Sequence, residues 1–215
     1  MANVKTYYKS KSGETNVSTN FKVKEFACKD GTDKLLLDMD ILPILERFRE
    51  YVEAPYSPNS AYRTVSHNKK EGGSSNSYHL YGRAFDIPFK STYKNLTSVD
   101  YMCKFFNTLG LKGIIKYPTF VHIDTRTGSK YHANNKKQRL TFGTVNIPFK
   151  GNLKNGSKNI YVGIMQYKLK MLGYAVGNAD MIFGSNTEKA VRTFQKDKGL
   201  AVDGICGKNT WSKLF

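Results

Sequence analysis

Two histidines and one aspartate are the residues of this 215-residue chain that are best suited to chemistry. His79 and Asp86 belong to the segment Ser-Tyr-His-Leu-Tyr-Gly-Arg-Ala-Phe-Asp, and His122 belongs to the later segment Phe-Val-His-Ile-Asp. Imidazole and carboxylate groups are common ligands of first-row metal ions, and three such ligands leave a fourth tetrahedral position for water, as a catalytic site requires. Gly82 allows the backbone to approach another segment closely. By residue type alone, surface histidines beside a structural aspartate are the commoner explanation.

The surrounding pattern predicts the strands that would position these residues. Residues 83–89 alternate small or apolar side chains with polar ones, as a strand does. Two further strands are predicted over residues 114–117 and 120–123, joined at a proline. If these strands pair, Asp86 and His122 come together.

Two helices complete this part of the chain. Asp40 is predicted to cap a helix that runs through apolar residues to Phe48, with Pro43 tolerated in its first turn. A second helix is predicted from Asp100 to a stop at Gly110. Because strand-like and helix-like segments mix, the sequence predicts an α+β fold with a small antiparallel sheet.

The pattern changes at a segment rich in Gly, Asn and Pro that has little periodicity. We therefore divide the chain into a first domain (residues 1–140), a linker (residues 141–154) and a three-helix domain (residues 155–215). The last region contains an internal repeat, because Gly-x-Asn-Thr occurs twice, each time at the start of a predicted helix. Thr187 and Thr210 are predicted to cap these two helices.

The charge is strongly positive, with 34 Lys and Arg against 17 Asp and Glu, which gives a formal net charge of +17. This favours a polyanion as partner, but no zinc finger, RNA-binding aromatic box or basic heptad accompanies it, so nucleic acid is not expected. A hydrophobic content of 40% excludes a disordered basic tail. No apolar run is long enough for a membrane span. The cysteines, Cys28, Cys103 and Cys206, lack metal-binding spacing and are predicted to be reduced thiols.

The pattern Ser-x-His-x-x-Gly-x-Ala-x-Asp, followed downstream by Val-His-Ile-Asp, resembles the zinc D-alanyl-D-alanine carboxypeptidases and the related L-alanyl-D-glutamate endopeptidases. These families cut the stem peptides of peptidoglycan, and bacteriophages use them as endolysins. The resemblance covers residues 18–130. Its upstream part comprises Asn20-Phe21, the segment from Glu25 to Gly31, the segment from Ser60 to Thr64, His67-Asn68 and Gly72-Gly73.

This resemblance implies one zinc ion on His79, Asp86 and His122. It also implies that Arg63 recognises a carboxylate or carbonyl of the substrate, which suits a planar guanidinium that can grip a carboxylate with two bonds. We assign Ser77, at the start of the metal motif, as a second substrate-binding residue.

The general base is where this chain departs from those families. Several relatives carry Glu, Asp or His two to six residues before the last zinc ligand, but residues 116–120 contain none of these. Asp124 shares a strand face with His122, so it either orients that ring, which we favour, or accepts a proton. Tyr117 could donate a hydrogen bond to the oxyanion. Other candidates for the base are His67, His132 and Glu71.

Residues 154–215 resemble the three-helix peptidoglycan-binding domain found on many wall hydrolases. Met181 departs from the pattern, because the first copy of the repeat usually has glycine there, and we expect this to tighten or shift one turn. The matching residues are Val162, Gln166, Leu169, Leu172-Gly173-Tyr174, Asp180, Phe183-Gly184, Thr187, Ala190-Val191, Phe194-Gln195, Gly199-Leu200, Val202-Asp203-Gly204, Gly207, Thr210-Trp211 and Leu214.

Both regions point to the same substrate. We therefore expect an endolysin-like zinc peptidase that hydrolyses a bond of the peptidoglycan stem peptide, with anionic wall polymers as additional partners. We expect a monomer. Because the N-terminus has no signal-like apolar stretch, we also expect the protein to stay in the host cytoplasm until it is released to the wall. The alternative, which the missing upstream acid keeps open, is a zinc-containing wall-binding protein without activity.

Overall fold

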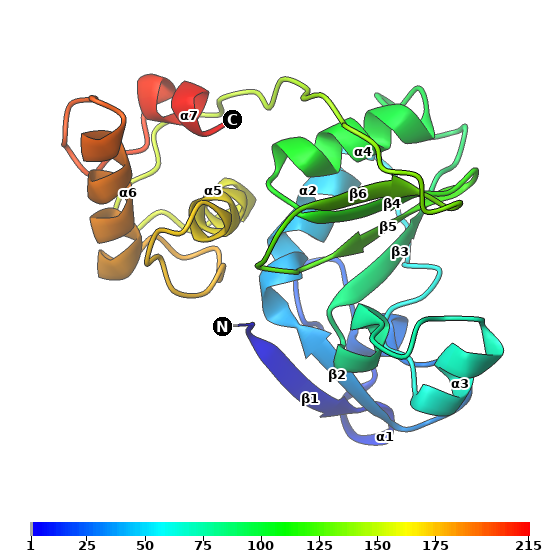
Figure 1. Ribbon diagram of the computed structural model, residues 1–215. Coiled ribbons are helices and arrows are strands. Elements are labelled where there is room, and N and C mark those ends of the chain that lie inside the picture. Colours follow the sequence, from blue (N-terminus) through cyan, green and yellow to red (C-terminus); the bar gives the residue numbers. More distant parts are fainter. Residues whose placement is uncertain (1) are drawn as a thin grey trace.

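The computed structural model describes residues 2–215 and contains two regions (Figure 1). The α+β domain contains the strands β1 (Val4–Tyr8), β2 (Lys34–Asp38), β3 (Ala84–Pro88), β4 (Gly113–Lys116), β5 (Phe120–Asp124) and β6 (Tyr131–Asn134). Its helices are α1 (Lys9–Ser12), α2 (Leu42–Val52), α3 (Val65–Lys70) and α4 (Val99–Thr108), with short 3-10 turns η1 (Val23–Phe26), η2 (Met39–Ile41) and η3 (Tyr78–Tyr81). The helical domain contains α5 (Ile160–Met171), α6 (Ser185–Asp197) and α7 (Lys208–Leu214). The predicted fold class is confirmed.

A four-stranded sheet with the order β3-β5-β4-β6 forms the centre of the α+β domain. The pairs β3–β5 and β5–β4 are antiparallel, whereas β6 runs parallel to β4. In the β3–β5 pair, Asp86 lies opposite His122, as the sequence predicted. On one face of the sheet α4 packs against β4 and β5, and the aromatic rings of Phe48, Phe105 and Phe106 pack together in the core. The sheet therefore fixes the positions of two candidate metal ligands.

Neither predicted helix begins at the aspartate that the sequence suggested. The helix start near Asp40 is instead preceded by η2, which Asp38 caps by accepting a hydrogen bond from the Asp40 backbone at 3.3 Å. The carboxylate of Asp40 binds the ammonium group of Lys170, and a charge-assisted bond of this kind is stronger than a bond to one amide. Likewise α4 is capped by Ser98 and not by Asp100.

The first copy of the repeat is held by a buried glutamine of α5. The side-chain NH₂ of Gln166 donates to Asp180 Oδ1 at 2.9 Å and to Thr187 Oγ1 at 3.0 Å. Its carbonyl oxygen accepts from the backbone N–H of Met181 at 3.0 Å. Thr187 is thus not the helix cap that the sequence predicted. It lies inside α6, which begins after Gly184, and its hydroxyl ties α6 to α5.

The second copy repeats this network with Gln195 of α6. Its NH₂ group donates to Asp203 Oδ1 at 2.7 Å and to Thr210 Oγ1 at 3.1 Å, and its carbonyl oxygen accepts from Gly204 N–H at 2.9 Å. Met181 in the first copy and Gly204 in the second occupy matching positions, and their φ angles are 66° and 73°. The prediction that Met181 tightens or shifts the turn of the first copy is therefore wrong. A left-handed backbone costs a non-glycine residue roughly 1–2 kcal/mol.

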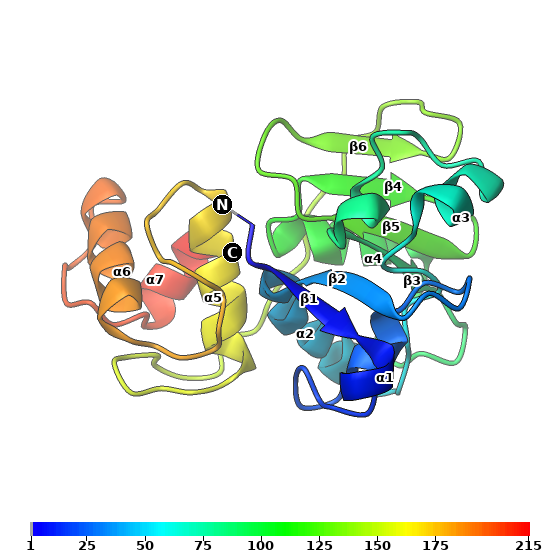
Figure 2. The same ribbon diagram turned by 90° about the horizontal axis from the view of Figure 1, so that it is seen from below.

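The segment between the two domains lacks regular structure but is attached to both of them (Figures 1 and 2). Phe142 and Ile147 are buried. The backbone N–H of Val145 donates to Thr108 Oγ1 at 2.9 Å on the α+β side. On the helical side, the indole N–H of Trp211 donates to the Ile147 carbonyl at 2.8 Å. The linker therefore lies along both surfaces and does not hang free.

Two features concern the whole chain. The cysteines at positions 28, 103 and 206 are buried and free, in agreement with the prediction of reduced thiols. Among the helices of residues 2–215, none combines the length and the apolar character that a bilayer crossing requires.

Lys168 of α5 makes the stability of the folded chain depend on pH. Its ammonium group donates to the Thr108 carbonyl of α4 at 2.6 Å, and burial lowers its pKa to about 8. Above this value the folded state binds fewer protons at Lys168 than the unfolded chain, so stability from this site rises with pH until the unfolded lysine also titrates. The variant Lys168→Met lacks this titration. We therefore expect the difference in free energy of unfolding, wild type minus Lys168→Met, to rise by about 1–2 kcal/mol between about pH 7 and pH 10, a range that includes a discount for partial exposure. Urea unfolding of both proteins at the two pH values measures this difference, and a constant difference would contradict it.

Candidate metal centre

Three side chains from separate elements meet at the middle of the β3–β5 pair. His79 comes from η3, Asp86 from β3 and His122 from β5. His79 Nε2 lies 3.2 Å from His122 Nδ1 and 3.3 Å from Asp86 Oδ1, and His122 Nδ1 lies 2.9 Å from the same oxygen. Each residue thus offers one ligand atom, and the three atoms lie within 4.8 Å of one another. This cluster, called the metal cluster below, can hold a metal ion.

The backbone around η3 sets the orientation of His79. The hydroxyl of Ser77 caps η3 by accepting a hydrogen bond from the His79 backbone. The ring Nδ1 lies 2.5 Å from the Ala61 carbonyl, which can only accept, so Nδ1 carries the proton and the Nε2 lone pair faces the cluster. Gly82 ends the turn at φ 64°, and a Cβ there would lie 2.2 Å from the Leu36 carbonyl oxygen. Gly82 therefore permits the close backbone approach that the sequence predicted.

Asp86 is buried and uses its two carboxylate oxygens differently. Oδ1 faces the two histidines, whereas Oδ2 accepts a hydrogen bond from Arg63 Nη2 at 2.7 Å. Arg63 Nε donates in turn to Ser60 Oγ at 2.7 Å. Burial raises the pKa of Asp86, but hydrogen bonds to His122 and His79 outweigh burial and hold it well below its usual range. The carboxylate is therefore ionised and directed at the cluster by Arg63.

Asp124 lies behind His122, on the side away from the cluster. Its Oδ2 is 3.6 Å from His122 Nε2. Both of its oxygens also bind the Arg126 guanidinium, at 2.7 and 2.6 Å. Burial lowers the pKa of His122, but contacts with Asp124 and Asp86 raise it to about 9. A Cβ on Gly113 would lie 2.0 Å from Asp124 Oδ1, so glycine makes room for this carboxylate.

The metal cluster lines an open pocket of about 770 Å³. Tyr117 stacks on Phe120 in its wall, with ring centroids 4.1 Å apart. Burial raises the pKa of Tyr117, so its hydroxyl keeps its proton and can donate. The other polar or charged residues of this wall include Arg63, Glu71, Ser77, Asp124, Arg126, Asn134 and Lys137.

The structure separates the remaining candidates for the base. Glu71 lines the pocket, whereas His67 and His132 are absent from its lining. His132 is buried beside the Leu111 carbonyl, at 3.4 Å. Sequence reasoning missed Arg126, which pairs with Asp124. The signal was available, because a residue two positions after Asp124 lies on the same side of an extended chain.

Two protein families match separate parts of the chain. The Peptidase M15 family matches residues 19–124, which include the whole metal cluster. The family described as a peptidoglycan binding domain matches residues 161–214, which include α6 and α7.

The similar proteins each share a short stretch with this chain. The N-acetylmuramoyl-L-alanine amidase CwlM of Mycobacterium tuberculosis is 41% identical over 54 residues, 25% of this chain and 13% of that protein. The spore cortex-lytic enzyme of Oceanobacillus iheyensis is 40% identical over 50 residues, 23% of this chain and 18% of that protein. The solved structure of a Burkholderia AP3 phage endolysin is 41% identical and has a TM-score of 0.28, covering 29% of this chain and 24% of that one. The chain thus spans less than a fifth of the length of these curated relatives.

Proposed function

We propose that this chain, which carries a Peptidase M15 domain over residues 19–124 and a peptidoglycan-binding domain over residues 161–214, is a zinc-dependent hydrolase of the peptidoglycan stem peptide. The α+β domain supplies the hydrolytic site, and the helical domain holds the enzyme at the wall. The observation that carries the proposal is the metal cluster of His79, Asp86 and His122 in the lining of an open pocket.

The chemistry of the donor set supports zinc as the metal. Two imidazole nitrogens and one carboxylate oxygen converge, and the tautomer of His79 leaves its Nε2 free to bind. Three protein ligands of this kind are typical of catalytic zinc sites. When bound, zinc polarises a carbonyl group and lowers the pKa of a water molecule to about 7.

The protein's own residues orient the ligands and the substrate. Asp124 orients the ring of His122, because its Oδ2 lies 3.6 Å from Nε2 and its negative charge keeps the ring proton on Nε2, which leaves Nδ1 for the metal. Arg63 anchors a ligand carboxylate and also lies in the pocket wall, where its remaining N–H groups bind a carboxylate or carbonyl of the peptide. Tyr117 donates a hydrogen bond to the oxygen that gains charge during hydrolysis. Ser77, in the same wall, contacts the peptide backbone.

The helical domain contributes by keeping the enzyme on an insoluble substrate. Binding to peptidoglycan raises the local concentration of stem peptide at the pocket without any new contact to the scissile bond. The net charge of +17 adds an attraction to anionic wall polymers that weakens as salt increases.

Digestion of purified peptidoglycan tests this function. We expect the enzyme to clear a wall suspension and to release peptides with new amino termini, which mass spectrometry assigns to a particular bond. A chelator should abolish clearing, and added zinc should restore it. A zinc-loaded protein that binds walls but releases no peptide would instead be the wall-binding protein without activity.

A further inference from the structure

The two copies of the repeat allow α5 to be compared with α6 position by position. Gln166 and Gln195 make matching hydrogen bonds to an aspartate, a threonine and a backbone N–H. Each residue of α5 therefore corresponds to the residue of α6 at the same distance along the helix from its glutamine. Where matched residues of α5 and α6 differ in type and burial, the difference indicates a contact that only one of the two copies makes.

One face of α5 differs from the matching face of α6. Gly163 and Tyr167, which lie one helical turn apart, are buried. Their counterparts, Arg192 and Lys196, are exposed. The first copy thus has a buried glycine and a buried tyrosine where the second has two exposed cations, of which Arg192 pairs with Glu188 at 2.9 Å. The face of the first copy is therefore covered by another part of the protein.

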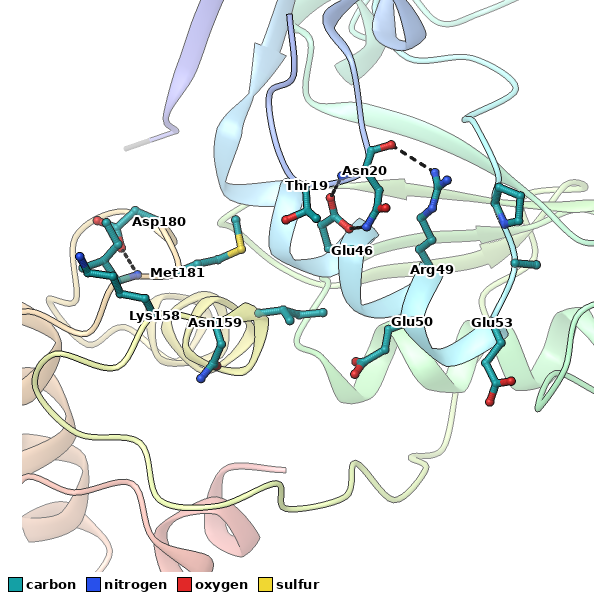
Figure 3. A pocket seen from close by; sticks show the side chains of 14 residues that line it. Thr19, Asn20, Glu46, Arg49, Glu50, Glu53, Lys158, Asn159, Asp180 and Met181 are labelled. Carbon is teal, nitrogen blue, oxygen red and sulfur yellow. Dashed lines mark hydrogen bonds between the residues drawn. The ribbon is translucent and has the colours of Figure 1, made fainter.

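That partner is α2 of the α+β domain. A Cβ on Gly163 would lie 2.5 Å from the Cβ of Pro43 and 2.6 Å from the Cγ of Met181, so the contact requires glycine. Met181 keeps the left-handed backbone that Gly204 has in the second copy, and its side chain points toward the α+β domain (Figure 3). Packing at this contact offsets the backbone strain. Beside it, both domains line an open groove of about 860 Å³.

Polar groups fasten the same contact. The buried carboxylate of Asp40 accepts two hydrogen bonds from the helical domain, one from the Lys170 ammonium group at 2.5 Å and one from the Ala179 backbone N–H at 2.9 Å. At the end of the contact, the Tyr161 hydroxyl donates to Glu50 of α2 at 2.7 Å. Separation of the domains would break these bonds between Asp40, Lys170 and Ala179 and the bond between Tyr161 and Glu50, so specific polar contacts hold the domains together in addition to apolar packing.

The hydrophobic core runs through the contact without interruption. Buried apolar residues of both domains form a single cluster. Tyr167 is fully buried within it. Burial raises the pKa of Tyr167 well above its ordinary value, and the carboxylates of Asp38 and Asp124 add to the effect, so this tyrosine of the helical domain lies near charged groups of the α+β domain.

We propose that the Gly163–Tyr167 face of α5 and the Met181 turn form a docking surface dedicated to the α+β domain, so that both domains move as one rigid body. Its consequence for activity rests on the proposed function. The helices bound to the wall then hold the catalytic pocket at a fixed distance and orientation from their point of attachment, in contrast to a module on a flexible tether.

The test converts the docking surface into the matching surface of the second copy. The triple variant Gly163→Arg, Tyr167→Lys and Met181→Gly uses only residues that the fold already holds at equivalent positions, so the helical domain has a template for folding. We expect its small-angle scattering to show an expanded particle. A protease of broad specificity should cut residues 141–154 at least about tenfold faster, because the linker opens more often. The ratio of hydrolysis rates on walls and on a soluble stem peptide should fall about fivefold or more, because orientation is lost.

A control variant adds the same charge elsewhere. Asn209→Arg with Ser212→Lys changes exposed positions of α7 and should keep the wild-type scattering and linker cleavage. If circular dichroism shows that the triple variant is unfolded, Gly163→Arg alone is measured in the same way. Wild-type scattering and cleavage in the folded variant would overturn the proposal, as would an unchanged ratio of rates in an expanded variant. Failure of the wild type on the soluble peptide would instead count against the proposed function, and the scattering result would still decide on docking.

Discussion

Asp86→Asn is expected to lower the rate of peptidoglycan hydrolysis by about a thousandfold and to reduce bound zinc to a trace. The amide keeps the shape of the side chain but removes the negative charge that faces His79 and His122. A catalytic metal supplies several kcal/mol of transition-state stabilisation, and about 1.4 kcal/mol corresponds to a factor of ten in rate. Metal analysis by mass spectrometry and peptide release from purified walls measure both effects.

The control is a histidine outside the metal cluster. His67→Gln removes an imidazole that the pocket lining does not include, so it should keep zinc and most of the activity. Circular dichroism must show that Asp86→Asn is folded. A folded Asp86→Asn variant that retains full zinc and activity would show that the three residues do not form the metal site.

Asp124→Asn is expected to weaken zinc binding by about 10- to 100-fold, with a similar loss of activity at limiting zinc. The reason is that Asp124 lies behind His122, with Oδ2 3.6 Å from Nε2, and therefore acts on the metal through this ring. An asparagine still offers an oxygen to Arg126 but no longer holds the ring by charge. Titration with a competing chelator measures the affinity, and saturating zinc should restore most of kcat.

The variant Glu71→Gln is compared with Asp124→Asn to decide which of the two carboxylates accepts the proton. Apart from Asp86 and Asp124, Glu71 is the acidic residue in the pocket lining of residues 2–215. If it accepts a proton, its replacement lowers kcat and leaves zinc affinity unchanged. If Asp124→Asn shows that pattern instead, Asp124 accepts the proton and does not orient His122.

The strands and their pairing could be predicted because local pattern determines them. The segment that became β3 was recognised as a strand that ends at Pro88, and β5 follows a proline turn, so Asp86 opposite His122 needed only correct pairing. Residue types only permitted a metal site there, and the resemblance of the motif to the zinc peptidases singled out His79, Asp86 and His122. The roles of Ser77, Arg63 and Tyr117 at the substrate stay predictions, although all three line the pocket.

The helix caps were predicted less well: α4 is capped by the nearby Ser98 and not by Asp100, and two other predicted caps bind distant partners. Asp40 has the residue type of a cap, yet its carboxylate binds Lys170 and Ala179 of the other domain. Thr187 also has the residue type of a cap, but its hydroxyl, inside α6, accepts a hydrogen bond from Gln166 of α5. No local pattern contains these partners. The left-handed backbone of Met181 also depends on packing that only the assembled chain provides.

The burial of the cysteines makes this chain convenient for measuring interdomain distances. Burial raises the pKa of both Cys103 and Cys206 to about 12, so at neutral pH they are almost wholly protonated and unreactive toward maleimide dyes. Cys28 is also buried. A fluorophore pair could therefore be attached at one engineered cysteine on α3 and another on α7 without removing a native thiol, and energy transfer would then report the separation of the domains in solution and on the wall.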